Sequence, residues 1–187
     1  MENMPEFTYG SLDRSEKRLV LQFHRKFPFP AEKVWQALSQ PDKQAAWFPT
    51  TIEGERKAVA QLRFSFTDME LPSFEGDMVT FNAPRVLEFT WAGETLRFEL
   101  QNKDGGTVLT FTNIFDELGK AARDGAGWHT SLDMLYYTVS GQKAPWSSAD
   151  RWREVHPNYV KLFGPEASTM GPPPEWEETY GSGSKPV

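Results

Sequence analysis

The stretch LGKAARDGAGWHTSLDMLYYTV (118–139) carries the pattern that decides the fold. Apolar and small residues recur in it at intervals of four, three, four, three and four, which places them on one face of a helix. They are Ala121, Gly125, Trp128, Leu132, Leu135 and Val139. The first half of this face is small, although a glycine inside a helix costs about 1 kcal/mol relative to alanine. The stretch therefore predicts a long helix that leaves either a close backbone approach or empty volume opposite its small residues.

The region before this helix, residues 51–115, alternates with a period of two and is interrupted by turn residues. The segments AQLRFSF (60–66) and TLRFEL (95–100) show the alternation most clearly, because their apolar residues all fall on one face. The strands that we expect are 51–55, 60–66, 73–81, 85–91, 95–100 and 107–115. Runs of Asn, Asp, Gly and Pro separate them, as is typical of an antiparallel meander. The long helix is expected to cover the apolar face of this sheet.

Residues 18–27 alternate as a first strand, which Pro28 and Pro30 end. Two short helices follow, in AEKVWQALS (31–39) and PDKQAAWF (41–48), each with a proline near its start. These elements together predict an α+β fold. In it a curved antiparallel sheet of six or seven strands wraps around one long helix, and two short helices follow the first strand.

The two ends of the chain are expected to lie outside this domain, which we place at 17–141. Residues 1–16 show little periodicity and predict a flexible lead-in. Residues 164–187 are rich in Pro, Gly, Ser and Glu, as in a flexible tail. Between the domain and the tail, residues 142–163 predict a tryptophan-containing helical extension packed on the domain, which Pro157 is expected to divide into two helices.

Composition narrows the classes of partner. A net charge of -6 and a pI near 5.2 argue against nucleic acid, whose phosphates are bound by clustered Lys and Arg. No apolar run approaches the roughly 18 residues of a membrane span, and the N-terminus lacks the apolar stretch of a signal peptide, so we expect a cytoplasmic location and no membrane partner. Without cysteine, thiolate chemistry is excluded. Three scattered histidines predict no metal site, and we expect no cofactor.

The order of one strand, two short helices, a six-stranded meander and a long helix resembles the START-like helix-grip superfamily, which includes the birch-pollen allergen fold and the polyketide cyclases. Four segments are similar to its bacterial branch related to the C-terminal domain of the activator of the heat-shock-chaperone ATPase: FPFPAEKVWQALSQPDKQAAWFP (27–49), RVLEFTW (85–91), GGTVLTFTN (105–113) and GWHTSLDMLYYTV (127–139). The resemblance implies a cavity between the long helix and the sheet, suited to apolar or amphipathic ligands. It also implies a role in the stress response and a chaperone as candidate partner. Independently of the resemblance, exposed edge strands make a second copy of the chain a candidate partner. The resemblance transfers no functional residue, because the superfamily has no shared catalytic motif.

Two sets of residues are candidates for a site. The ligand-binding set comprises Leu62, Phe64, Phe66, Phe98, Leu100, Trp128, Leu132, Leu135 and Tyr136, and the alternative for these residues is a filled core. His129 and Asp133 are four apart on the long helix and would suit a catalytic base and the carboxylate that orients it, although a pair on the helix surface is the simpler interpretation. The charged residues that alternate on the strands are expected on the solvated face; they are Glu75, Asp77, Glu88, Arg97 and Glu99.

Three functions follow from these residues and from the resemblance. The leading hypothesis is non-enzymatic binding of a small apolar or amphipathic ligand. The second is an enzyme of the aromatase or cyclase kind that uses the same pocket, with His129 as acid or base. The third is a co-chaperone-like interaction module, which would expose an apolar patch around Trp146, Trp152 and Trp176. Whether the extension after Gly141 fills the pocket is open at this point.

Overall fold

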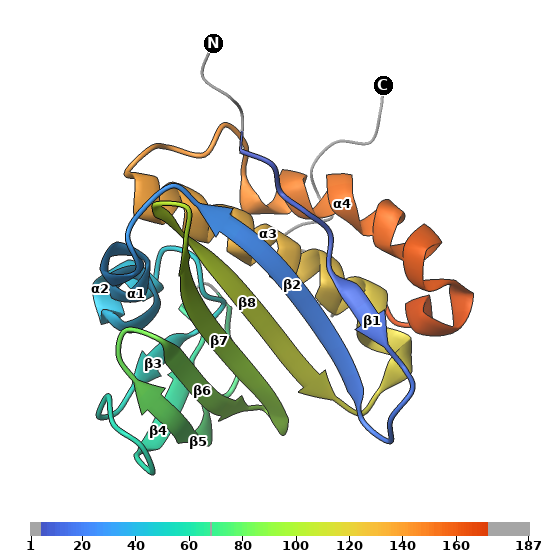
Figure 1. The fold of residues 1–187 in the computed structure, drawn as a ribbon. Coiled ribbons are helices and arrows are strands. Elements are labelled where there is room, and N and C mark those ends of the chain that lie inside the picture. Colours follow the sequence, from blue (N-terminus) through green and yellow to red (C-terminus); the bar gives the residue numbers. More distant parts are fainter. Residues whose placement is uncertain (1–4, 68, 172–187) are drawn as a thin grey trace.

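The computed structural model describes residues 5–67 and 69–171. One antiparallel sheet dominates it, with the strands in the order β1-β2-β8-β7-β6-β5-β4-β3. Figure 1 shows this sheet curving around helix α3, with α1 and α2 near the β7 side and β1 lying over the edge next to β2. Helix α4 packs on α3. The structure has the α+β helix-grip fold that the sequence predicted.

The elements match the predicted ones closely along most of the chain. The strands are β1 (Ser11–Asp13), β2 (Leu19–Phe27), β3 (Thr51–Glu53), β4 (Gln61–Ser65), β5 (Phe74–Asn82), β6 (Val86–Trp91), β7 (Glu94–Lys103) and β8 (Gly106–Phe115). The helices are α1 (Ala31–Ser39), α2 (Pro41–Gln44), α3 (Ala121–Ser140) and α4 (Ser148–Phe163), with short 3-10 turns at Leu118–Lys120 and Pro165–Ser168. None of the helices in the described part of the chain is long and apolar enough to cross a membrane.

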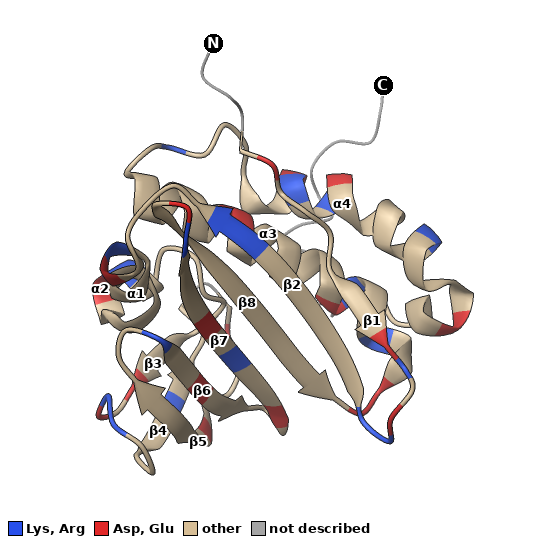
Figure 2. Cartoon of the chain, in the orientation of Figure 1, with Lys and Arg blue, Asp and Glu red and all other residues tan. Residues whose placement is uncertain are grey.

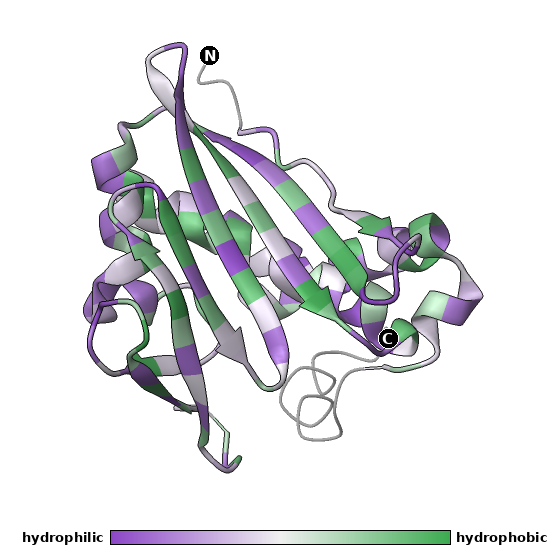
Figure 3. Cartoon of the chain, turned by 60° about the horizontal axis from the view of Figure 1, so that its bottom comes forward, coloured by the Kyte–Doolittle hydropathy of each residue, from purple (hydrophilic) through white to green (hydrophobic). Residues whose placement is uncertain are grey.

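The strands form because side chains of alternating polarity can place one kind on each face of a sheet. Figure 3 shows this alternation as bands of opposite hydropathy along the central strands. Two tight turns join neighbouring strands, Ala92-Gly93 between β6 and β7 and Asp104-Gly105 between β7 and β8. All four turn residues have positive φ, between 51° and 80°, as a two-residue hairpin with the twist of the strands requires. The first turn sets Glu94 directly opposite Trp91.

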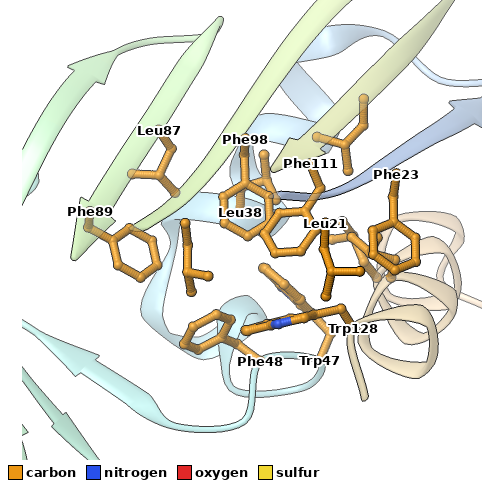
Figure 4. Packing of buried hydrophobic residues seen from close by; sticks show 14 of the residues in the cluster. Leu21, Phe23, Leu38, Trp47, Phe48, Leu87, Phe89, Phe98, Phe111 and Trp128 are labelled. Carbon is orange, nitrogen blue, oxygen red and sulfur yellow. The ribbon is translucent and has the colours of Figure 1, made fainter. Parts of the chain in front are cut away.

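The concave face of the sheet carries the core. Figure 4 shows Trp47, Phe48 and Trp128 from the helical side facing aromatic side chains of the sheet. The ring centroids of Trp128 and Phe111 are 5.0 Å apart, and those of Trp47 and Phe98 are 5.7 Å apart. Such edge-to-face and tilted contacts stabilise the core beyond the area that they bury. The apolar face predicted from the alternation is therefore closed by α3 and by the residues after α2.

The outer face of the sheet carries ion pairs between neighbouring side chains, and Figure 2 marks the charged residues of β7 in blue and red. Arg97 on β7 pairs with Glu88 on β6 and with Glu99 on its own strand, each at 3.1 Å. Glu75 and Asp77 on β5 are exposed. Glu75, Asp77, Glu88, Arg97 and Glu99 lie on the solvated face, as their alternation predicted.

Two segments differ from the expectation. Residues 11–13 fall inside the predicted lead-in, yet they form β1 and pair with β2, which gives the sheet its eighth strand. The predicted break at Pro157 is wrong, since α4 runs through it as one helix. Val155 and Tyr159 on either side of the proline are buried in the core. Their burial holds the helix together across the missing backbone hydrogen bond.

Candidate functional site

A cavity of about 530 Å³ lies between the first half of α3 and the end of the sheet formed by the β4–β5 connection and the β6–β7 turn. This volume falls in the range of small-molecule sites. Five segments form its walls. They are residues 45–49 after α2; Phe66, Met69 and Leu71; Trp91, Ala92 and Glu94; Lys120, which precedes α3, with the α3 residues Arg123, Asp124, Gly127, Trp128, Thr130, Ser131 and Met134; and Ser148, Trp152 and Arg153 of α4.

Three aromatic rings make the floor of the cavity. Phe48, Trp91 and Trp128 touch one another, with centroids 5.6 to 5.9 Å apart. Figure 4 shows Phe48 and Trp128 side by side between the sheet and the helix. Trp91 is fixed further by a hydrogen bond from its indole Nε1 to the Thr50 hydroxyl at 3.3 Å. The floor offers a rigid aromatic surface that can stack on a flat ligand.

Two glycines of α3, Gly125 and Gly127, have different surroundings. A methyl group added at Gly125 would lie 3.1 Å from the rings of Tyr159 and Phe163, so this glycine allows α4 to pack closely on α3. A methyl group added at Gly127 would meet nothing within 4 Å. Gly127 lines the cavity instead. Close approach therefore occurs at Gly125, which belongs to the predicted face, and open volume occurs at Gly127, which lies outside it.

One end of the cavity is charged. Glu94 lies more than nine-tenths buried at the start of β7, and its Oε1 is 2.9 Å from Lys120 Nζ at the start of α3. Lys120 also lies 3.6 Å from Asp124, which Arg123 Nε contacts at 2.9 Å. Two cations and two carboxylates thus alternate along this wall. A polar wall facing an aromatic floor suits an amphipathic ligand.

Burial and neighbouring charges determine the protonation of Glu94 and Lys120 at the charged end of the cavity. Burial raises the pKa of the Glu94 carboxyl above its ordinary value, against the opposing effect of Lys120. Burial alone would lower the pKa of Lys120, but Asp124 and Glu94 outweigh it and raise that pKa. Lys120 therefore keeps its proton at neutral pH. Burial therefore disfavours the charged form of Glu94.

The C-terminal extension forms a wall of the cavity and does not fill it. Ser147 caps α4 by accepting a hydrogen bond from the Asp150 backbone at 3.1 Å. This start directs Trp152 into the cavity wall, where its indole donates to the Arg123 carbonyl and its ring stacks on His156. Trp146 packs edge-on against Tyr137. Trp146 and Trp152 are half-buried, and Trp176 lies outside the described residues.

The predicted ligand-binding residues divide between the cavity and the core. Phe66 and Trp128 line the cavity. Six others are buried in the core cluster, namely Leu62, Phe64, Phe98, Leu100, Leu132 and Leu135. Tyr136 packs on the rings of Phe27 and Phe29. The alternation along the strands identified the inward face, but it could not tell which part of that face is filled.

His129 and Asp133 lie away from the cavity, on the side of α3 that faces β2 and α4. Both are fully buried, so the expected pair on the helix surface is wrong. Asp133 accepts from Arg25 Nη1 at 2.6 Å and from Arg151 Nε at 2.7 Å. His129 Nδ1 is 2.8 Å from the Tyr159 hydroxyl. This network joins β2, α3 and α4, and His129 does not reach the cavity as an acid or base there would have to.

The charge of His129 is suppressed by this position. Burial, followed by the neighbouring Arg25 and Arg151, lowers the pKa of its imidazole to about 2. The ring is therefore neutral at every physiological pH. Among the described residues, no group of three or more His, Asp or Glu is placed to hold a metal ion.

The charged end is the part of the site that the sequence prediction missed. Glu94 follows a hairpin turn, and Lys120, Arg123 and Asp124 lie in the first turns around the start of α3. These residues come from segments more than twenty positions apart, so no local spacing connects them. A weaker signal for the charged end was present in the sequence. Glu94 directly follows a tight turn and the other charges lie at a helix start, and both places are at the rim of such a sheet.

Comparison with solved structures places the fold among known proteins. Protein EF2215 of Enterococcus faecalis, described as a conserved protein of unknown function, is 19% identical over 82% of this chain and 91% of its own, with a TM-score of 0.66. CalU16 of Micromonospora echinospora is 18% identical over 83% and 94%, with a TM-score of 0.62. The BPP1335 product of Bordetella parapertussis is 25% identical over 83% and 91%, with a TM-score of 0.63.

No match was found among curated protein sequences. The family model described as Activator of Hsp90 ATPase homolog 1-like protein matches residues 28–140, which is more than half of the chain. The matched region holds the aromatic floor, the charged end and Gly127, whereas α4 lies beyond it. With its helix-grip fold and this match, the chain belongs to the family of Activator of Hsp90 ATPase homolog 1-like proteins.

Proposed function

We propose that this protein binds a small hydrophobic or amphipathic ligand, without converting it chemically, in the cavity between α3 and the sheet. The observation that carries the proposal is the cavity itself, with about 530 Å³ of space above the rings of Phe48, Trp91 and Trp128. Large aromatic side chains normally fill the space beside them, because protein interiors are closely packed. An aromatic floor under open volume is typical of a binding pocket.

Gly127 supports the same proposal. A glycine within a helix costs about 1 kcal/mol relative to alanine, and no neighbour requires its small size, since an added methyl group meets nothing within 4 Å. The consequence of the missing side chain is a larger cavity, because Gly127 is part of its wall. Gly127 thus lowers the stability of the helix and enlarges the cavity. A ligand that occupies the cavity would explain why this position is a glycine.

The proposal is tested by titrating the protein with N-phenyl-1-naphthylamine, a neutral aromatic probe whose fluorescence rises in an apolar site. We expect saturable binding to the unaltered protein and to Gly127→Ala. We expect no saturable binding to Gly127→Trp, whose indole would occupy the cavity. Gly127→Ala is the matched control, because it changes the same helix position and adds one methyl group. Equal binding by all three proteins would place the probe elsewhere and contradict the proposal.

A further inference from the structure

The cavity joins two kinds of surface, and the junction restricts what can bind. Its floor is apolar and aromatic, formed by Phe48, Trp91 and Trp128. Its wall at the start of α3 carries the pair of Glu94 and Lys120, whose closest atoms are 2.9 Å apart. A ligand that lies on the floor and fills the cavity brings one of its ends to this pair. The chemistry of the pair therefore selects the polar group of the ligand.

The charges of this wall are already balanced. Lys120 and Arg123 supply two positive charges, and Glu94 and Asp124 supply two negative charges in direct contact with them. Arg153, on the part of the wall that α4 forms, is paired with Asp150 at 3.1 Å. A charged ligand group would leave one charge uncompensated in a partly buried place, which is costly. Charge balance therefore favours a neutral polar group over a carboxylate or an amine.

The wall still has hydrogen-bonding capacity. Glu94 Oε1 is buried and has no well-aligned hydrogen bond, although Lys120 Nζ is close to it. An ammonium has three donors, and Lys120 contacts two carboxylates, so one donor remains. Beside Glu94, the fully buried Asn113 has no well-aligned hydrogen bond from its amide nitrogen or to its amide oxygen. Buried polar atoms without a well-aligned hydrogen bond are rare in native proteins, and here the Glu94 oxygen that faces Lys120 belongs to a residue of the cavity wall.

A hydroxyl group satisfies both requirements, because it donates one hydrogen bond, accepts another and carries no charge. We infer that Glu94 and Lys120 form a subsite for the hydroxyl group of a neutral aromatic ligand. The hydroxyl donates to Glu94 and accepts from Lys120, while the ring system lies on Phe48, Trp91 and Trp128. This inference rests on the proposed function, since it names the class of molecule that the cavity takes.

The test compares four ligands of one shape: biphenyl, 4-hydroxybiphenyl, biphenyl-4-carboxylate and 4-(aminomethyl)biphenyl. Dissociation constants are measured at pH 7 by displacement of N-phenyl-1-naphthylamine. We expect 4-hydroxybiphenyl to bind about tenfold more tightly than biphenyl, because it gains hydrogen bonds to two charged partners. The carboxylate and the amine are expected to bind more weakly than 4-hydroxybiphenyl.

The double variant Glu94→Gln/Lys120→Met removes both charges of the pair together, so neither is left alone. In this variant the preference for 4-hydroxybiphenyl over biphenyl is expected to fall from about tenfold to about onefold. The matched control is Arg97→Met/Glu88→Gln, which removes an ion pair of the outer face and keeps the preference. Circular dichroism checks that both variants are folded.

The outcomes separate the subsite from the proposed function. Equal affinity for biphenyl and 4-hydroxybiphenyl, or tighter binding of the carboxylate or the amine, would overturn the subsite and leave the proposed function standing. A preference that persists in Glu94→Gln/Lys120→Met would also overturn the subsite. If biphenyl and 4-hydroxybiphenyl both fail to bind the unaltered protein, the proposed function fails, and the subsite fails with it.

Discussion

At the scale of single residues, Asp133 has the most demanding environment in the molecule. Its carboxylate is fully buried and accepts from Arg25 at 2.6 Å and from Arg151 at 2.7 Å. Burial raises the pKa of this carboxyl, and the two guanidinium groups oppose the rise. This carboxylate therefore contacts two cations that come from β2 and α4, and it joins three elements, although Arg151 also pairs with Glu154 at 3.2 Å.

Replacement of Asp133 with Asn is expected to destabilise the fold by about 3–5 kcal/mol, because it leaves the buried Arg25 without its counter-charge and leaves Arg151 only its pair with the exposed Glu154. Urea denaturation measures the change. The control is Asp116→Asn, which breaks the exposed pair of Arg18 and Asp116 and should change stability little. Similar effects of the two substitutions would contradict the role given to Asp133.

The buried His129 should make the stability of the fold depend on pH. The folded chain holds this imidazole neutral, with a pKa of about 2, whereas the unfolded chain protonates it near pH 6.5. Between these values the unfolded state binds one more proton, so stability falls as the pH falls, by about 1.4 kcal/mol per unit. From pH 7 to pH 5 we expect unaltered protein to lose about 2 kcal/mol more than His129→Gln does.

Urea denaturation at pH 7 and pH 5 measures this difference. Other groups whose pKa is shifted in the folded chain, such as His156, whose pKa burial lowers, are present in both proteins and cancel in the comparison. Parallel losses in the two proteins would show that His129 is not held neutral.

The sequence predicted that His129 and Asp133 would be neighbours on one helix face. It did not predict their burial, because Arg25 and Tyr159, which make burial tolerable, are 104 and 30 positions from His129 in the chain.

At the scale of elements, α3 contains two glycines with different roles. Gly125 lies against Tyr159 and Phe163 of α4, and Gly127 faces the cavity. Alanine at either position should improve helix propensity by the same amount, about 1 kcal/mol. Whether the gain in helix propensity stabilises the protein depends on what the added methyl group contacts.

We expect Gly127→Ala to raise the free energy of unfolding by about 1 kcal/mol, because the new methyl group enters open space. Gly125→Ala should be clearly less stable than Gly127→Ala, since its methyl group lies 3.1 Å from two rings of α4 that must move. Denaturant titration of the two variants gives the comparison directly. An equal gain at both positions would mean that α4 does not pack closely on α3.

Most elements were predictable because their signals are local. The six strands of the meander alternate with period two between turn residues, and their observed ends lie within a few residues of the predicted ones. β1 was missed because three residues carry no measurable period, and contacts with β2 and Tyr159 hold the segment in place. The continuity of α4 was missed for a related reason. A local rule, that proline ends a helix, is outweighed by the burial of Val155 and Tyr159.

At the scale of the whole molecule, the cavity is a product of the topology. The hairpin turn of β6 and β7 supplies Trp91 and Glu94, the start of α3 supplies Lys120, and α4 adds Trp152. The sequence predicted the layers between which the cavity lies. It could not predict which end of that interface stays open, because the answer depends on how side chains from distant segments fill the curved sheet.

The central claim is that this cavity holds a small molecule in the native protein. Native mass spectrometry of the protein from its own host tests it most directly, with Gly127→Trp purified in the same way. We predict a mass above 21.4 kDa for the unaltered chain, with a small aromatic molecule released on denaturation, and no such molecule on Gly127→Trp. The bare chain mass for the unaltered protein, or the same molecule on both proteins, would contradict the account.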